Sequence, residues 1–460
     1  MKFNLRYVIG MSLISALAGF LFGYDWVVIG GAKPFYERFF ELVQFPGLQG
    51  LAMSSALIGC IGGAVISGWI GEKFGRRSSL MMAALLFIFS SVGTGAVGSF
   101  TWFMTFRIVG GIGIGLASAT SPVYIAEISP AKYRGRMVTL NQLNIVVGIL
   151  AAQIVNYLIA QQVPDGASDQ FIQNSWNGQM GWRWMFWAEA IPATIFFILL
   201  FFIPESPRWL AKVSRWEKAE WVLQMIGGDE YARSARKKIA ETLADGSQKV
   251  PLKSLLSHDI KPMLMVGIVL ALFQQWCGIN IVFNYAEEVF SAAGYEVSDI
   301  LLNIVITGVV NLLFCVLAIR TVDRWGRRRL MLLGSLGLSI LYVILGISYY
   351  LEMQGTTILV IVVLCIAVYA MTLAPITWVV LSEIFPNRVR GVAMAIATTT
   401  LWIASSILVI TFPYFNRGLN THGTFWLYAG ICLAGFLFIY KRLPETKGKT
   451  LEEIEKELSE

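Results

Sequence analysis

The stretch YVIGMSLISALAGFLFGYDWVVIG, residues 7–30, is an apolar segment that contains a single charged side chain, Asp25. About 20 apolar residues are enough for an α-helix to cross a membrane. An acid inside such a segment costs about 3 kcal/mol on insertion, so it indicates a functional site with a partner for the charge. The stretch therefore predicts a membrane-spanning helix that carries a functional carboxylate at Gly23-Tyr24-Asp25.

The composition of the whole chain agrees with this prediction. The 460 residues are 56% hydrophobic and 14% charged, with a mean hydropathy of +0.64. Soluble domains carry about 25% charged residues, so the composition excludes an ordinary soluble protein. The net charge of +7 comes from basic clusters between apolar segments. This distribution fits the positive-inside rule rather than a nucleic-acid partner.

Twelve apolar segments of spanning length follow one another along the chain. Their limits are 7–30, 50–70, 79–98, 102–126, 137–160, 184–203, 262–289, 298–319, 330–350, 357–381, 391–413 and 424–440. None shows the alternation of a membrane barrel, so the segments predict helices. The first is expected to be a helix and not a removed signal peptide, because apolar segments continue throughout the chain.

The basic loops predict the orientation of these helices. They are 72–77, 132–136, 323–329 and 387–390, and each follows an even-numbered segment. Such loops face the cytoplasm. The stretch 161–182 has no Lys or Arg and is expected outside. Both termini are then cytoplasmic.

Two motifs occur twice in the chain. GEKFGRR at 71–77 recurs as VDRWGRR at 322–328, and AEISPAKYRG at 126–135 recurs as SEIFPNRVRG at 382–391. PESP at 204–207 has a weaker echo in PETK at 444–447. The repeat predicts two parallel six-helix halves, 1–203 and 262–441, of the kind found in transporters that alternate around a midplane site. The linker 204–261 and the tail 442–460 are expected on the cytoplasmic side, with short amphipathic helices at 211–226 and 231–243.

In this order, the motifs resemble the sugar porter family of the major facilitator superfamily, which includes bacterial xylose–proton and glucose–proton symporters and mammalian facilitative glucose transporters. The resemblance rests on Gly23-Tyr24-Asp25, the two Gly-Arg-Arg loops, Arg107-Ile-Val-Gly-Gly, Pro204-Glu-Ser-Pro-Arg208, Gln274-Gln275-x-x-Gly278-x-Asn280 and Pro444-Glu-Thr-Lys-Gly448. It implies the major facilitator fold: an all-α membrane protein with twelve transmembrane helices and short cytoplasmic helices.

Three charged residues lie at one predicted depth. Asp25, Arg107 and Glu189 each lie about five residues from the outer end of their segments, or roughly 8 Å at 1.5 Å per residue. One hypothesis is that Asp25 carries a coupling proton, with Arg107 as its partner and Glu189 as a second acceptor. The alternative is a static ion-pair cluster that fixes helix register. The resemblance favours coupling, because symporters of the family carry an acid where many facilitators carry an amide.

A sugar has hydroxyl groups and no charge, so its site needs amides that donate and accept, together with aromatic faces. The residues that match sugar-contacting positions of the family are Phe22, Gln142, Gln274, Gln275, Asn280, Asn311, Trp378 and Trp402. A lone amide in such a helix is otherwise explained by an interhelical hydrogen bond, and a lone Trp by packing. Leu401, Ile149 and Asn284 depart from the family pattern, which leaves the identity of the sugar open.

The repeated motifs place charged residues at the inner ends of the helices. The resemblance implies salt bridges between the halves that act as a cytoplasmic gate, made by Arg76, Arg77, Glu127, Arg134, Arg327, Glu383 and Arg390. The alternative is a topogenic signal with lipid headgroup contact. The acids Glu127 and Glu383 argue against that alternative, because acids contribute little to orientation.

The sequence thus predicts a monosaccharide–proton symporter that works by alternating access in the plasma (inner) membrane. The alternatives are a facilitative sugar uniporter, a non-transporting sugar sensor and a membrane-embedded enzyme. No cofactor, metal or catalytic residue is expected, since the only histidines, His258 and His422, fall in loops. The expected partners are a glucose-like or xylose-like monosaccharide, a proton and membrane lipid, but no nucleic acid, and the expected state is a monomer.

Overall fold

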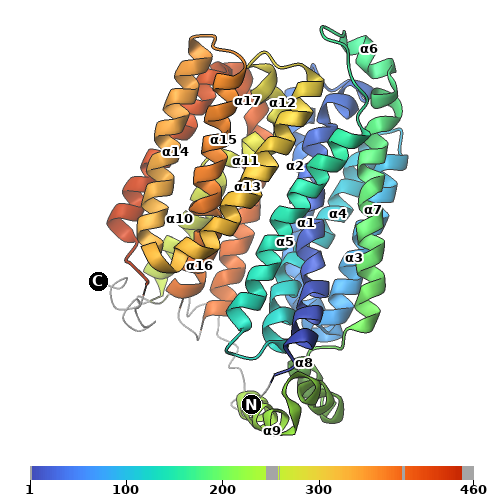
Figure 1. The fold of residues 1–460 in the computed structure, drawn as a ribbon, viewed down its shortest axis with the longest axis vertical. Helices are drawn as coiled ribbons and strands as arrows, with labels where there is room; N and C mark the ends of the chain where they lie inside the picture. Colours follow the sequence, from blue (N-terminus) through green and yellow to red (C-terminus); the bar gives the residue numbers. More distant parts are fainter. Residues whose placement is uncertain (1–2, 245–256, 258–259, 386–388, 448–460) are drawn as a thin grey trace. The chain divides into compact units, whose positions relative to one another are not determined.

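The computed structural model describes residues 3–244, 257, 260–385 and 389–447, without the side chains of 242, 244, 319, 322–324, 390 and 391. Within these ranges the regular structure is helical and contains no strand (Figure 1). The long helices before the linker are α1 (Leu5–Phe39), α2 (Pro46–Phe74), α3 (Arg76–Ala96), α4 (Phe100–Ile128), α5 (Arg134–Ile159) and α7 (Trp182–Leu199). Those after it are α10 (Lys261–Trp276), α13 (Val297–Trp325), α14 (Arg327–Tyr350), α15 (Thr356–Met371), α16 (Leu373–Ile384) and α17 (Arg390–Arg442).

Among the described residues, 11 helical stretches are long and apolar enough to cross a membrane. One of them belongs to α17, which has 53 residues and would be about 80 Å long as a single straight helix. The hydrocarbon core of a bilayer is only about 30 Å thick. The backbone of α17 leaves the helical region at Asn420, where φ is 57°. This break divides α17 into the predicted segments 391–413 and 424–440, so the prediction of an all-helical membrane protein is confirmed.

The first helix is longer than predicted. Hydropathy ends the first segment at residue 30, whereas α1 continues to Phe39 through Lys33, Glu37 and Arg38. These charged side chains lower the local hydropathy without ending the helix. The reason is that all three are paired: Lys33 and Arg38 contact Glu287 from a distant part of the chain, and Glu37 contacts Lys33 one turn before it.

Two segments predicted as single helices are interrupted. Segment 262–289 divides into α10, α11 (Ile279–Asn284) and α12 (Ala286–Ser291). The first break is at Gly278, with φ +87°, a left-handed conformation that glycine adopts without steric cost. Segment 357–381 divides into α15 and α16 at Thr372. Both stretches are still long and apolar enough to cross a membrane, as predicted, and the structure adds the interruptions.

The linker contains two helices, as expected, with different limits. They are α8 (Pro207–Lys212) and α9 (Trp216–Ala244), and α9 contains a break at Gly228. Two further short elements lie in the stretch expected outside: α6 (Asp169–Asn174) and a π-helical turn, Asn177–Gly181, that leads into α7. Residues 245–256 and 258–259 lie outside the described part of the linker.

Contacts divide the chain into two compact units. Unit 1 comprises Met1–Trp26, Gly59–Ile149 and Phe186–Lys249, and unit 2 comprises Val27–Ile58, Leu150–Met185 and Val250–Glu460. In unit 1, α3 packs on α4. In unit 2, α17 packs on α14 and α10, and α13 packs on α15. The division into halves 1–203 and 262–441 stays a prediction.

Glycine allows helices of unit 1 to approach closely. A Cβ atom at Gly59 of α2 would lie 2.1 Å from the carbonyl oxygen of Ile108 on α4. A Cβ at Gly115 of α4 would lie 2.4 Å from the carbonyl oxygen of Cys60. Such small-residue contacts are typical of helices in membranes, where van der Waals packing drives association.

Candidate functional site

The charged residues Asp25 and Arg107 form an ion pair in unit 1. The Nη1 atom of Arg107 contacts Oδ1 of Asp25, and Nη2 donates to the Asp25 carbonyl oxygen at 3.1 Å. Both side chains are 1% exposed. Glu189 is also buried and interacts electrostatically with both residues. The structure therefore brings the three charges predicted at one depth into one site.

The pairing in this site is incomplete. Oδ2 of Asp25, Nε of Arg107 and Oε1 of Glu189 are buried and have no hydrogen-bond partner among the described residues. The Arg107 guanidinium lies 5.4 Å from the centre of the Phe186 ring. A Cβ at Gly110 would lie 3.1 Å from Oδ2 of Asp25, so the glycine keeps space beside that oxygen. One cation between two buried carboxylates is an arrangement in which a proton or a change of partner can rebalance the charge.

Three predicted sugar-binding amides form a hydrogen-bonded chain in unit 2. Nδ2 of Asn280 donates to Oε1 of Gln275 at 2.5 Å, and Nε2 of Gln275 donates to Oε1 of Gln274 at 2.5 Å. Nε2 of Gln274 then donates to the Tyr369 hydroxyl at 2.7 Å. Each amide is thereby held in one orientation, as a site that recognises hydroxyl groups requires.

The break at Gly278 makes this chain possible. Gln275 and Asn280 are five residues apart, and such residues lie on different faces of an uninterrupted helix. The left-handed Gly278 reorients α11 relative to the end of α10. A Cβ there would also lie 2.7 Å from the Tyr428 ring, so only glycine fits both the backbone and the neighbour.

The remaining predicted sugar residues are distributed over both units. In unit 1, the ring of Phe22 stacks on Trp26 with centroids 5.8 Å apart, and Gln142 is half-buried on α5. In unit 2, Asn311 and Trp402 are buried and Trp378 is half-buried. Their joint role in sugar binding stays a prediction.

The sequence analysis missed two polar residues of unit 2. Tyr369 ends the amide chain and has no charge or motif that marks it. Gln153 on α5 is 2% exposed, and neither Nε2 nor Oε1 has a hydrogen-bond partner among the described residues. Gln153 lies one helical turn after Ile149, the position where a family amide is missing. That spacing is a signal that sequence reasoning could have used.

The end of unit 1 that is predicted to face the cytoplasm is held by an ion pair, a hydroxyl and a half-buried acid, which are called the inner network below. Arg76 contacts Glu127 at 3.0 Å, and the Ser206 hydroxyl donates to Glu127 at 2.5 Å. The Glu205 carboxylate accepts the backbone N–H groups of Arg76 at 2.9 Å and Arg77 at 3.1 Å, at the start of α3. These are N–H groups that a helix leaves unpaired at its N-terminus. Burial raises the pKa of Glu205, and its backbone N–H donors act in the opposite direction.

Unit 2 contains the same arrangement at the second copy of the motifs. Arg327 contacts Glu383 at 3.2 Å, and the Thr446 hydroxyl donates to Glu383 at 2.6 Å. The Glu445 carboxylate accepts the backbone N–H of Arg327 at 2.9 Å. PESP and PETK therefore have matching roles. Each supplies an acid that accepts a backbone N–H at the start of a helix, and a hydroxyl that donates to the glutamate of an Arg–Glu pair.

The other predicted gate residues bond nearby backbone. Arg77 donates through Nε to the Leu200 carbonyl at 2.8 Å, and Arg134 through Nε to the Ala126 carbonyl at 3.0 Å. The side chain of Arg390 lies outside the described residues. Each ion pair reported for Arg76 and Arg327 joins elements of one unit, so a lock between halves stays a prediction.

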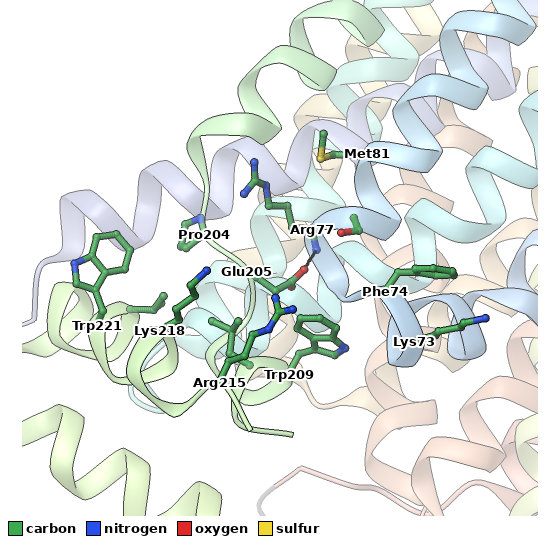
Figure 2. Close-up of a pocket in the computed structure, with 13 residues that line it drawn as sticks. Lys73, Phe74, Arg77, Met81, Pro204, Glu205, Trp209, Arg215, Lys218 and Trp221 are labelled. Carbon is green, nitrogen blue, oxygen red and sulfur yellow. Dashed lines mark hydrogen bonds between the residues drawn. The ribbon is translucent and has the colours of Figure 1, made fainter. Parts of the chain in front are cut away.

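A cavity of about 750 Å³ lies beside the inner network of unit 1. Figure 2 shows Glu205 at its centre, with Arg77, Arg215, Lys218 and Trp221 around it. None of the predicted sugar residues lines this cavity. It is basic and aromatic and lies near the ends of apolar helices, a composition typical of the membrane interface rather than of a sugar site.

Comparison with known proteins agrees with these observations. The chain is 39% identical to the D-xylose-proton symporter of Escherichia coli (strain K12), covering 99% of this chain and 96% of the relative. It is 34% identical to the glucose facilitated diffusion protein of Zymomonas mobilis, covering 97% and 96%. The solved structure of the E. coli xylose transporter in a partially occluded inward open conformation matches with a TM-score of 0.85 at 38% identity, covering 97% of this chain and 100% of that one.

The family model for "Sugar (and other) transporter" matches residues 11–458, nearly the whole chain. The match includes both copies of the inner network, the Asp25–Arg107 pair and the amide chain. The chain therefore belongs to the sugar (and other) transporter family.

Proposed function

We propose that this protein carries a monosaccharide across the membrane together with a proton. The observation that supports this most is the buried site of Asp25, Arg107 and Glu189. In this site the cation Arg107 contacts one carboxylate and interacts electrostatically with the other. A xylose–proton symporter is among the relatives that match over nearly the full length. Acids within a membrane that share a partner are typical of proton pathways.

In the proposed mechanism, Asp25 binds the proton. In this structure Arg107 is the countercharge of Asp25. Glu189 offers Arg107 a second acceptor, and movement of Arg107 toward it leaves Asp25 to take up a proton. Coupling requires that the conformations facing the two sides bind the proton and the sugar with different affinity.

The sugar is proposed to bind through the amide chain of Gln274, Gln275 and Asn280. Its other contacts are proposed to be Phe22, Gln142, Asn311, Trp378 and Trp402. Gln153 joins this set, because a buried amide without partners is costly unless a ligand satisfies it in another state. The substrate class is a neutral hexose or pentose.

The remaining expectations accompany this proposal. The protein is expected to act as a monomer in the inner membrane, with both termini in the cytoplasm and the halves alternating around the site. Lipid headgroups are expected at the basic inner ends of the helices. The mechanism forms no covalent intermediate and needs no cofactor.

The deciding experiment is uptake of radiolabelled xylose and glucose into proteoliposomes, with and without an imposed inward proton gradient. Asp25→Asn is expected to abolish accumulation against a gradient and to keep exchange of labelled for unlabelled sugar. Glu296→Gln, which changes an exposed acid, is the matched control and should behave as wild type. Unchanged gradient-driven accumulation in Asp25→Asn would contradict the assignment.

The second candidate is a facilitative uniporter, which the full-length match to a glucose facilitated diffusion protein supports. In that case uptake would equilibrate the sugar and ignore the proton gradient, and the three charges would only fix helix register. Sugar binding without any translocation would instead indicate a sensor. Chemical conversion of the sugar in the same assay would indicate an enzyme.

A further inference from the structure

A buried lysine lies near the end of α1 that is predicted to face outside. The side chain of Lys33 is 2% exposed, and its Nζ contacts Glu37 and Glu287 at 3.1 Å and Glu288 at 2.7 Å. An ammonium group has three N–H donors. Three carboxylates therefore take up the whole hydrogen-bonding capacity of Lys33. Glu37 lies on α1, whereas Glu287 and Glu288 lie on α12, and all belong to unit 2.

A second cation, Arg38, completes this group. Its Nη1 contacts Glu287 at 3.0 Å, and its Nε contacts Asp169 of α6 at 2.7 Å. Glu287 thus contacts a cation through each of its two carboxylate oxygens. Asp169 is 63% exposed, so water stabilises its charge. The other five members, of which Lys33 and Glu37 are buried and Arg38, Glu287 and Glu288 are half-buried, are called the outer cluster below.

The outer cluster has an excess of carboxylates. It contains two cations and three acids, so full ionisation would leave one buried negative charge without a countercharge. An uncompensated charge in such a site is strongly unfavourable. A bound proton on one of the acids removes that cost.

Unpaired oxygen atoms show which acids are involved. Oε1 of Glu37 and Oε2 of Glu288 are buried and have no hydrogen-bond partner among the described residues. The other oxygen of Glu37 accepts from Lys33 and from Nε2 of Gln49 on α2, both at 3.1 Å. Within the described part of the chain, Glu37 and Glu288 therefore share the single cation Lys33, whereas Glu287 also contacts Arg38.

Neighbouring polar groups outside the outer cluster have donor bonds of their own. Tyr285 donates to the Val409 carbonyl at 2.7 Å, and Arg417 of α17 donates to the Val43 carbonyl at 2.9 Å. Tyr36 donates to Sδ of Met53 at 3.1 Å. Over the described ranges, no group of His, Cys, Asp and Glu has the arrangement of a metal site. These observations favour a proton over a metal ion as the compensating charge.

We propose that Glu37 and Glu288 together bind one proton, which completes the ion-pair connection between α1 and α12. This site is separate from Asp25, and the inference goes beyond the proposed transport function. With the proton bound, the outer cluster is neutral and holds α12 against α1. Without it, the two acids repel each other and the connection weakens.

The fold allows α12 to respond to such a change. Helix α12 has six residues and follows the non-helical Tyr285, with φ −119° and ψ 37°. The left-handed Gly278 lies only a few residues earlier. Two breaks let the segment move without bending a helix. Acid outside is therefore expected to stabilise the attachment of α12, and alkaline conditions to loosen it. A proton taken up from outside and returned there adds nothing to the transported charge.

The first test is infrared spectroscopy of the purified protein across pH, following the C=O stretch of protonated carboxylic acids. Glu37→Gln and Glu288→Gln each leave two cations and two acids, so each should lose about one protonated carboxyl relative to wild type. Because the proton is shared, the double variant should lose no more than either single variant. Glu296→Gln is the control and should keep the wild-type band. An unchanged band in both single variants would overturn the proposal, as would additive losses.

Lys33→Met provides the reciprocal test. It removes a cation, which leaves one cation against three acids, so the protonated carboxyl band should increase rather than decrease. A band equal to or weaker than that of wild type, in a protein that still elutes as a single species, would contradict the charge balance. This readout needs no sugar and no transport, so its failure is distinct from failure of the proposed symport.

The second test follows hydrogen exchange of the amides of α12. In wild type, the protection factors of these amides, which correct for the intrinsic pH dependence of exchange, should fall as the pH rises and the proton is lost. In Glu37→Gln and Glu288→Gln that fall should disappear, because a charge-balanced cluster has no proton to lose. A fall that persists in both variants would separate the motion of α12 from these acids.

Discussion

At the scale of single residues, the buried amide Gln153 gives a test that separates binding from stability. Its neighbour one turn further on α5, Asn156, is also buried, but Asn156 donates to the Val28 carbonyl at 2.9 Å. Gln153 has no such bond among the described residues. The protein therefore pairs the side-chain nitrogen of Asn156, although not its Oδ1, whereas neither polar atom of the Gln153 side chain is paired among the described residues.

Gln153→Leu is expected to raise the sugar KM by about tenfold, which corresponds to roughly 1.4 kcal/mol. Stability should stay the same or increase, because the substitution removes an unsatisfied buried polar group. Asn156→Leu should lower the thermal unfolding midpoint, because Val28 loses its donor. The measurements are initial uptake rates against sugar concentration and thermal unfolding in detergent. A Gln153→Leu variant with an unchanged KM would remove Gln153 from the sugar site.

At this scale, the sequence predicts a functional residue where its side chain is energetically costly to place in an apolar segment. An acid in an apolar segment is expensive, so residue type marks Asp25, and the shared depth makes Arg107 a possible partner. That the two helix faces meet is seen only in the structure. Lys33 and Glu37 obey the same rule, but they lie beyond the apolar run, and Glu287, a partner of Lys33, is 254 residues further along the chain. No local pattern connects them, so the outer cluster required the structure.

At the scale of elements, a glycine and a carboxylate fix the junction between α3 and the loop before it. Gly75 precedes the helix with φ +94° and ψ 167°, a conformation that is essentially restricted to glycine. A Cβ there would lie 2.2 Å from Oε2 of Glu205. That carboxylate is held by the N–H groups of Arg76 and Arg77, so it has little freedom to move away.

Gly75→Ala is therefore expected to destabilise the protein by about 1–3 kcal/mol, from backbone strain together with displacement of Glu205. Gly326→Ala in unit 2 should have a similar effect, since its φ is +85° and its Cβ would lie 2.6 Å from Glu445. Gly68→Ala is the control, because a Cβ at this helical glycine meets no atom within 4 Å. Thermal or denaturant unfolding of the three variants gives the comparison. Equal stability of Gly75→Ala and Gly68→Ala would contradict the argument.

Hydropathy predicted the number of crossing segments but not where helices break. Gly278 is visible in the sequence, yet a glycine inside an apolar run is equally compatible with close helix packing. Its left-handed backbone follows from the Tyr428 ring beside it and from the bond between Asn280 and Gln275. Both are tertiary contacts, which a pattern of apolar residues does not contain.

At the scale of the whole molecule, the proposed coupling predicts a number. If Asp25 carries the only transported proton, one pH unit across the membrane supplies about 1.4 kcal/mol per sugar. At zero membrane potential, the sugar should then accumulate about tenfold at steady state. The measurement is the ratio of internal to external labelled sugar in tightly sealed proteoliposomes.

Other ratios would have a definite meaning in that experiment. A ratio near one, independent of the gradient, would identify a uniporter. A ratio near one hundred would mean that two protons cross, and the proton of the outer cluster would then be transported rather than returned. The Glu288→Gln variant distinguishes the two sources, because it should keep the tenfold ratio if only Asp25 contributes.

The matching inner networks also bear on the history of the chain. A glycine with positive φ, an acid at the helix start, a hydroxyl and an Arg–Glu pair occur in both units with the same connections. The simplest account is that one ancestral gene already encoded all four parts before it was duplicated and fused. In a protein with one copy of the repeat, the Arg and Glu of the network would have paired within that copy. The inner network therefore first stabilised a single half.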